Sequence, residues 1–345
     1  MMSEPRYVFL DQNHWIYLAK AFRGHPHAPG HTAALQYLVT KVDRDDVRLP
    51  LLQVHLMEHY NADDAGRRDR LAEVFDRFSR GWSVAAWNDV LPAEIMRAIA
   101  LTFGHPDVPA APQVFGKGVL FGVGPEGRST FPAHWSRADA ERLNRFSQSP
   151  GALHDFLTLP HESGRIEAKK GIADLGERNA RAVEQLRAAR RPYPKAMHRR
   201  AQLVGYMKDD FLCRQIAVAL GSIGKTLDSF IALGADGLEN FWSLVPTMHV
   251  DCELTLYRDR QWSRAVKEND VYDIAQMVIA VPYCDAVVVE RFWARAIQET
   301  GLAKKYGTAV CADLTELPAI LAERRKGGEQ CLTRRSRRRP RAGRA

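Results

Sequence analysis

The sequence has few cysteines and no paired-cysteine motif. The chain contains five, an odd number: Cys213, Cys252, Cys284, Cys311 and Cys331. The absence of any CxxC spacing argues against a disulfide framework and against a zinc site made of thiolates. We therefore expect a protein of a reducing compartment, the cytoplasm.

Long hydrophobic runs are also missing. No apolar stretch approaches the roughly 18 residues of a membrane helix, and the first residues, MMSEPRYVFL, lack the basic start and apolar core of a secretion signal. We expect no membrane association. With 345 residues, 46% of them hydrophobic and 26% charged, the composition is that of a soluble globular protein of one large or two ordinary domains.

The net charge of +8 does not describe the body of the protein. Residues 324–345 carry ten Arg or Lys against one acid, Glu329, whereas the remaining 323 residues carry 39 bases and 40 acids. A tail this polar and self-repelling is expected to be disordered by itself. It is able to hold phosphates electrostatically, and a merely solvated terminus explains it equally well.

Strand and helix patterns alternate in the first 90 residues. Strands are expected at 6–10, 47–51 and 82–87, and helices at 14–23, 32–43, 52–61 and 66–80. The alternation resumes near the end, with a helix at 271–281, strands at 286–290 and 308–312, and a helix at 291–300. This order predicts an α/β fold whose two chain portions share one parallel sheet flanked by helices.

The segment between these two portions has a different character. Pro and Gly are dense after residue 90, and Ala-, Arg- and Glu-rich helical patterns run from about 137 to 243. We interpret 1–90 and 261–323 as two parts of one domain, 91–260 as a large, mostly helical insertion or cap, and 324–345 as a disordered basic tail. An Arg-rich stretch at 187–200 is typical of an exposed helix, so the insertion is better explained as a lid.

Two further motifs have simpler structural explanations. GSIGKT at 221–226 resembles a phosphate-binding loop, but Ala219 occupies the position of its first Gly and a helical pattern precedes it. A helix end explains Gly221 and Gly224. MHVDCEL, from Met248, places His249, Asp251 and Glu253 on one side if it forms a strand, and we interpret that side as a polar face.

HLMEH at 55–59 fits the inverted zinc-peptidase signature. On a helix, His55 and His59 share a face, and Glu58 between them has the chemistry of a base. The third ligand is not identifiable. Two half-exposed helix histidines are the simpler interpretation, and a zinc peptidase stays open as an alternative.

Four acids from four chain regions are expected to meet at one edge of the sheet. Asp11 follows the first strand, and Glu58 lies in the helix after the second. Asp273 is in the first turn of the late helix, with Asp270 three residues before it on the same face. The strand 286–290 then delivers Glu290 to the carboxyl edge, where ligands bind in open parallel sheets.

The same geometry places Asp285 at the opposite end of the last of these strands, roughly 16 Å away at about 3.3 Å per residue. Clustered carboxylates repel one another and lose water on burial, so they require protonation or a cation. All-oxygen ligands favour Mg²⁺ or Mn²⁺. Solvated helix caps explain any one of these acids alone.

This ordered set resembles the PIN-domain nucleases. The motifs that carry the resemblance are FLDQN with Asp11 and Asn13, HLMEH with Glu58, NDVYD with Asp273 beside Asp270, and AVVVER with Glu290. PYCDAVVVER also resembles the family's stretch before the final strand, which draws attention to Asp285. The last acid is usually Asp in the family, and the helical insertion here is much longer.

The resemblance implies a PIN-like fold and metal-dependent hydrolysis of phosphodiesters, in RNA more than in DNA. It implies that Asp11, Glu58, Asp273 and Glu290 hold Mg²⁺ or Mn²⁺, and that Asn13 orients a bound water. Asp270 and Asp285 are supporting residues. A nucleic-acid-binding protein that keeps the scaffold but not the chemistry is a further alternative.

Overall fold

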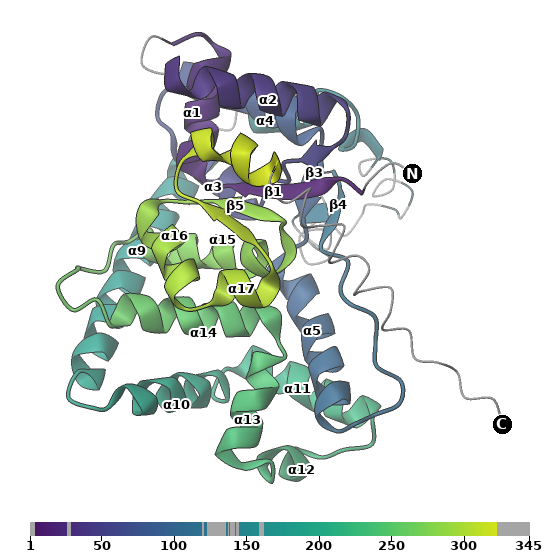
Figure 1. The fold of residues 1–345 in the computed structure, drawn as a ribbon, viewed down its shortest axis with the longest axis vertical. Helices are drawn as coiled ribbons and strands as arrows, with labels where there is room; N and C mark the ends of the chain where they lie inside the picture. The colour runs from purple at the N-terminus through teal and green to yellow at the C-terminus, as the bar shows by residue number, and fades with distance from the viewer. Residues whose placement is uncertain are drawn as a thin grey trace.

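The computed structural model describes residues 4–25, 29–118, 121–122, 136, 138, 142, 145–158 and 162–322. Within them the protein is a mixed α/β fold, mostly helical, with a small parallel sheet at one end and a helical region at the other (Figure 1). The basic tail at 324–345 lies outside the described residues. No described helix is both long and apolar enough to cross a membrane.

The sheet combines the two ends of the chain. Its four strands are parallel in the order β2-β1-β5-β6, with β1 paired to both β2 and β5. These strands are β1 (Arg6–Leu10), β2 (Val47–Arg48), β5 (Ala286–Val288) and β6 (Ala309–Cys311). The predicted parallel sheet shared by the two chain portions is confirmed.

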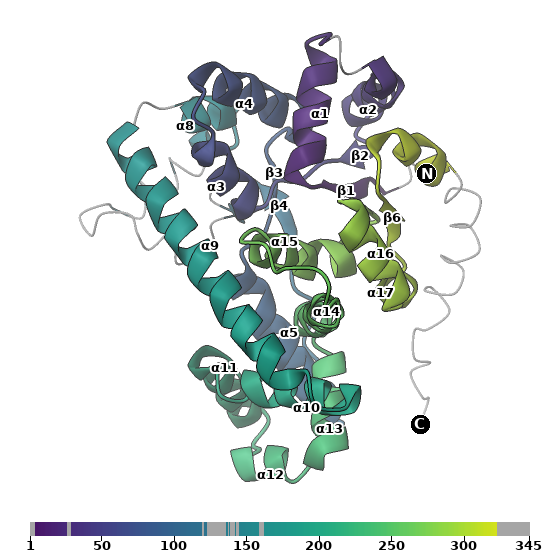
Figure 2. The same ribbon diagram turned by 90° about the vertical axis from the view of Figure 1, so that its left-hand side faces the viewer.

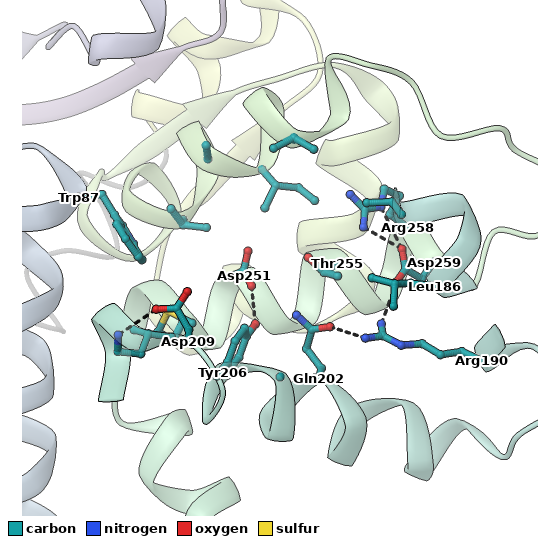
Figure 3. A pocket seen from close by; sticks show the side chains of 18 residues that line it. Trp87, Leu186, Arg190, Gln202, Tyr206, Asp209, Asp251, Thr255, Arg258 and Asp259 are labelled. Atoms are coloured by element: carbon teal, nitrogen blue, oxygen red, sulfur yellow. Dashed lines mark hydrogen bonds and ion pairs between the residues drawn. The ribbon is translucent and has the colours of Figure 1, made fainter. Parts of the chain in front are cut away.

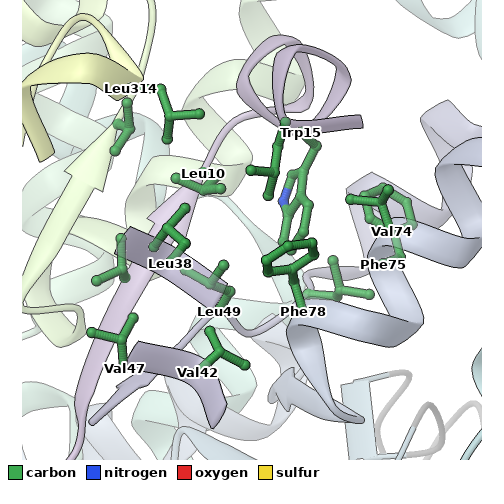
Figure 4. Close-up of a cluster of buried hydrophobic side chains, with 14 of the residues drawn as sticks. Leu10, Trp15, Leu38, Val42, Val47, Leu49, Val74, Phe75, Phe78 and Leu314 are labelled. Carbon is green, nitrogen blue, oxygen red and sulfur yellow. The ribbon is translucent and has the colours of Figure 1, made fainter. Parts of the chain in front are cut away.

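Alternation along the strands separates two hydrophobic cores. In β1, Val8 and Leu10 pack on one face and Phe9 on the other, because successive side chains of a strand point to opposite faces. The first core joins the strands to α1 (Gln12–Phe22), α2 (Thr32–Asp43) and α4 (Ala65–Ser79), with Trp15, Phe75 and Phe78 at its centre (Figure 4). The second packs against α15 (Asp270–Tyr283) and α16 (Arg291–Glu299). Both faces are covered, which explains the near-continuous apolar strands.

The strand expected at 82–87 does not join this sheet, which corrects the prediction of a third strand there. Residues Trp82–Val84 form β3, which pairs antiparallel with β4 (Phe115–Lys117) in a separate two-stranded sheet. Among the described residues, a single bridge, Leu51 to Ser83, links it to the chain after β2. Local apolar character could not distinguish these arrangements, because the partner strand lies in the Pro- and Gly-rich segment.

Residues 249–254 are helical, which corrects the interpretation of this segment as a strand with one polar side. It belongs to α14 (Pro246–Asp259), whose alternating buried residues arise from helices packed on several sides. His249 and Glu253 consequently share one face, with Nε2 and Oε1 at 3.7 Å. Asp251 does not join them.

The helices of residues 87–102 and 162–259 form the helical region, and the remaining helices connect the strands (Figure 2). The long helix α9 packs against both α3 and α15. As expected, GSIGKT ends a helix, and Gly224 there adopts a φ of +67°. The bounds are α3 (Gln53–Asn61), α5 (Trp87–Thr102), α8 (Ala152–Thr158), α9 (Glu162–Arg190), α10 (Lys195–Tyr206), α11 (Asp210–Ser222), α12 (Leu227–Ile231), α13 (Gly234–Ser243) and α17 (Leu302–Tyr306), with short 3-10 turns at Pro29–His31 and Leu314–Glu316.

Candidate acidic site

Asp11 lies at the junction between β1 and α1. Its backbone N–H donates to the Val288 carbonyl at 3.0 Å, so it lies where β1 and β5 end together. Its carboxylate caps α1 by accepting the N–H of His14 at 3.0 Å, and the same oxygen, Oδ1, lies 2.5 Å from Nδ1 of His14. Asp11 is therefore held by a helix cap and an imidazole at the carboxyl edge of the sheet.

Glu290 reaches the same edge from the end of β5. Its Oε1 accepts a hydrogen bond from Nδ2 of Asn13 at 2.7 Å. Glu290 is the N-terminal flanking residue of α16 and is exposed. The structure brings Asp11, Asn13 and Glu290 together, as predicted from the strand directions.

Glu58 and Asp273 are the half-buried members of the group. Burial raises the pKa of Glu58 to about 8, and the carboxyls of Asp273 and Asp11 act in the same direction. Burial also raises the pKa of Asp273 to about 7, with the nearby Glu290 and Asp11 again contributing. A hydrogen bond from Nε1 of Trp293 to Oδ2 of Asp273, 2.9 Å long, opposes these effects. We call Asp11, Glu58, Asp273 and Glu290 the acidic site.

A cavity of about 10 Å³ lies beside Asp11 and Asp273, large enough for about one water-sized sphere. Gln276, three residues after Asp273 on α15, lines it, and its Oε1 is buried without a hydrogen-bond partner among the described residues. Oε2 of Glu58 is likewise buried and unpartnered there. Unsatisfied buried oxygens are costly and indicate a missing donor or cation.

The carboxyl groups of the acidic site lie too far apart to be ligands of one metal ion as they stand. In the part of the chain that is described, no three His, Cys, Asp or Glu side chains are grouped closely enough to hold a metal ion. His14, Trp293 and Asn13 hold one oxygen each of Asp11, Asp273 and Glu290. The all-oxygen donor chemistry and the two orphaned oxygens fit Mg²⁺ or Mn²⁺, and binding would require these side chains to move closer.

Asp270 and Asp285 lie outside the acidic site. Asp270 is fully buried and forms a bidentate pair with Arg264, at 2.6 and 2.7 Å. Asp285 precedes β5 and accepts the N–H of Tyr7 through Oδ2 at 2.9 Å, at the opposite end of the strands. Both contacts maintain the fold around the site: Asp270 anchors the start of α15, and Asp285 aligns β1 with β5.

His55 and His59 are both fully buried, which corrects the interpretation of half-exposed histidines. Nδ1 of His55 accepts the N–H of Leu52 at 3.1 Å, and His59 directs Nε2 to the Leu157 carbonyl at 3.3 Å. Both rings pack near Phe75, and burial lowers the pKa of each imidazole to about 4. These contacts pack both histidines into the core, and Nε2 of His55 and Nδ1 of His59 have no hydrogen-bond partner among the described residues.

Sequence reasoning missed four neighbours of the acidic site: His14, Arg264, Gln276 and Trp293. Three of them follow an acid of the site by three residues, a spacing that places two side chains on one helix face. The pKa of Arg264 is raised, first by its hydrogen bonds to Asp270 and then by the charges of the nearby Asp273 and Glu290. The position of Arg264 beside the acidic site could not be deduced from the sequence, because this residue lies in a loop before α15.

Comparison of the chain with protein-family models, with curated proteins and with solved structures finds no match. A functional conclusion therefore depends on the chemistry of the acidic site.

Proposed function

We propose that this protein is a Mg²⁺- or Mn²⁺-dependent nuclease that hydrolyses phosphodiester bonds, in RNA in preference to DNA, on a PIN-like scaffold. The observation that carries the proposal is geometric: Asp11 and Asp273, from separate parts of the chain, border one small cavity, and Oε2 of Glu58 is buried without a partner among the described residues. Two of these three carboxyls have pKa values raised to about 8 and 7. A group of acids held in this costly arrangement is typical of a functional site.

Each side chain has a role that follows from its position. Asp11 and Asp273 border the small cavity and would be direct ligands, and Glu58 would contribute its unpartnered Oε2. Glu290, exposed and joined to Asn13, would bind directly or through water on the solvent side. A divalent cation bound here would supply Lewis-acid activation of water and stabilisation of the leaving oxygen.

The test is a cleavage assay of the full chain on mixed RNA and DNA substrates, with Mn²⁺ and with EDTA. Asp11→Asn should lower the rate by more than about 100-fold, because an amide cannot supply the negative charge. The melting temperature should be unchanged, since Asn also caps helices well. Asp228→Asn, at an exposed acid of α12, is the matched control and should leave the rate unchanged.

Three outcomes would contradict the proposal. An Asp11→Asn protein that cleaves at the unmodified rate removes the acidic site from catalysis. Tight RNA binding without Mn²⁺-dependent cleavage identifies a non-catalytic binder. Bound Zn²⁺ with dependence on both His55 and His59 identifies a peptidase.

A further inference from the structure

A second cavity, of about 600 Å³, lies within the helical region and away from the acidic site. Helices α9, α10, α14 and α15 surround it, and Trp87 and Leu212 border it from α5 and α11 (Figure 3). Its volume is within the range of small-molecule sites, about 300–1,000 Å³. The apolar walls include Val183 and Leu186 from α9, and Val271, Ile274 and Val278 from α15.

Helix α14 contributes polar side chains to this mostly apolar cavity. Asp251, Thr255 and Arg258 follow one another at spacings of four and three residues, so they form a stripe on the face turned to the cavity. Figure 3 shows Asp251 near the middle of the cavity, Trp87 at one end and Arg258 at the other. A helix face packed only for stability would present apolar residues here.

The arginines of the cavity are already paired. Nε and Nη2 of Arg258 donate to Oδ1 of Asp259, at 3.0 and 2.8 Å. Arg190 donates to Oδ2 of Asp259 at 3.1 Å and to Gln202 at 3.0 Å. Both guanidinium groups are therefore engaged with an opposite charge or an amide oxygen.

Asp251 has no hydrogen-bonded cation within the described part of the chain. Its Oδ2 accepts the hydroxyl of Tyr206, and Oδ1 has no hydrogen bond or ion pair to any described residue. Burial raises its pKa, which the Tyr206 hydroxyl and the charge of Arg258 oppose. Asp209, the other acid lining the cavity beside Asp259, caps α11 by accepting the N–H of Leu212 at 2.9 Å. Among the described residues, the half-buried group of the cavity that lacks a directly bonded opposite charge is thus the carboxylate of Asp251.

We propose that this cavity is a binding site for a small organic ligand with an apolar, preferably aromatic, body and one protonated amine that pairs with Asp251. The apolar walls of α9 and α15 would cover the body, and Trp87 offers an aromatic face near the rim, where it is 36% exposed. The proposal is independent of the nuclease activity, because α15 presents Val271 and Ile274 to this cavity and Asp273 to the acidic site.

The experiment compares probes that differ only in their polar group. Tryptamine, tryptophol and indole-3-propionate share an indole ring and carry an ammonium, a hydroxyl and a carboxylate, and octylamine, octanol and octanoate form an aliphatic set. Dissociation constants are measured on the full chain by calorimetry, with melting temperature as a second readout. Each amine should bind at least about tenfold more tightly than its alcohol, with the acid weaker still.

Two variants assign the binding to the cavity. Asp251→Asn retains the shape but removes the charge, and should reduce the preference for amine over alcohol to less than about threefold. Ala275→Leu fills space from α15 at a residue exposed to the cavity and should weaken both compounds. Asp236→Asn, at an exposed acid of α13, is the matched control and should change neither.

Equal affinity for amine and alcohol in the unmodified protein would overturn the proposal, as would tighter binding of the acid. A preference for amines that persists in Asp251→Asn would place the cation elsewhere. Equal weakening by Asp236→Asn would identify diffuse surface attraction. If Asp251→Asn does not fold, Ala275→Leu tests the proposal by itself. Unchanged affinity of that variant for the amine and the alcohol excludes this cavity as the binding site.

Discussion

The Nδ2 atom of Asn13 donates to Oε1 of Glu290 at 2.7 Å, across 277 residues of sequence. This contact joins the first strand-helix junction to the end of β5 and closes the carboxyl edge of the sheet. It is possible because β1 and β5 are parallel neighbours in register, with Leu10 opposite Val288. The contact also separates the two candidates for the last acid of the site, because Asp285 is at the other end of the same strands.

Glu290→Gln should lower the cleavage rate by about 10- to 100-fold, because it removes a negative charge beside Asp273 while keeping a hydrogen-bond acceptor for Asn13. Asp285→Asn should leave the rate within about twofold and lower the free energy of unfolding by about 1 kcal/mol, since its bond to the Tyr7 amide is weakened. Rates and urea unfolding of both proteins measure these effects. The reverse pattern would assign the final acid to Asp285.

The free energy of unfolding should decrease as pH rises through the range in which the half-buried acids Glu58 and Asp273 titrate. The pKa of Glu58 rises from 4.5 to about 8 on folding, and that of Asp273 from 3.8 to about 7. The folded protein therefore holds these protons at pH values where the unfolded chain has lost them, so the free energy of unfolding falls between about pH 4 and pH 8. Above about pH 8 this contribution should become constant.

Glu58→Gln should remove part of this slope and, at pH 8.5, raise the free energy of unfolding by on the order of 2 kcal/mol, a value reduced for partial solvent access. Urea unfolding at pH 5 and pH 8.5 without metal measures the difference. Glu316→Gln, at an exposed acid, should reproduce the slope of the unmodified protein. Mn²⁺ should restore stability more at pH 8 than at pH 6, because its ligands must be deprotonated. A slope unaffected by Glu58→Gln would contradict the coupling.

Trp293→Phe should shift the pH midpoint of Mn²⁺ binding upward by about half a unit to one unit. The indole N–H of Trp293 stabilises the charged form of Asp273, so its loss raises the pKa of that carboxyl further. The measurement is Mn²⁺ affinity by calorimetry between pH 6 and pH 8.5. Trp242→Phe serves as the control, because the buried N–H of Trp242 has no partner among the described residues and lies in the helical region. Equal midpoints for the two variants would exclude a positioning role for Trp293.

Most of the α/β portion was predictable from local patterns. The apolar run at 6–10 is β1 itself, and the helix expected at 32–43 is α2 with the same bounds. The strand expected at 47–51 is shorter, because only Val47 and Arg48 pair with β1. The strand expected at 82–87 joined another sheet, and 249–254 became a helix. In these cases the packing or pairing partner is distant in sequence, so a local apolar pattern does not specify it.

The order of strands and helices along the chain was enough to place Asp11 and Glu290 at the same edge of one parallel sheet. Parallel strands place their carboxyl ends together, so this juxtaposition follows from chain direction alone. The pairing of β1 with β5, the solvent exposure of each acid and its ion pairs came from tertiary packing, because they depend on residues from other elements. Arg264 neutralises Asp270, whereas Oε2 of Glu58 and the carboxylate of Asp251 lack a bonded opposite charge among the described residues. Burial without such a partner is a property of the packed interior, and it is what distinguishes the two candidate sites from the paired acids of the chain.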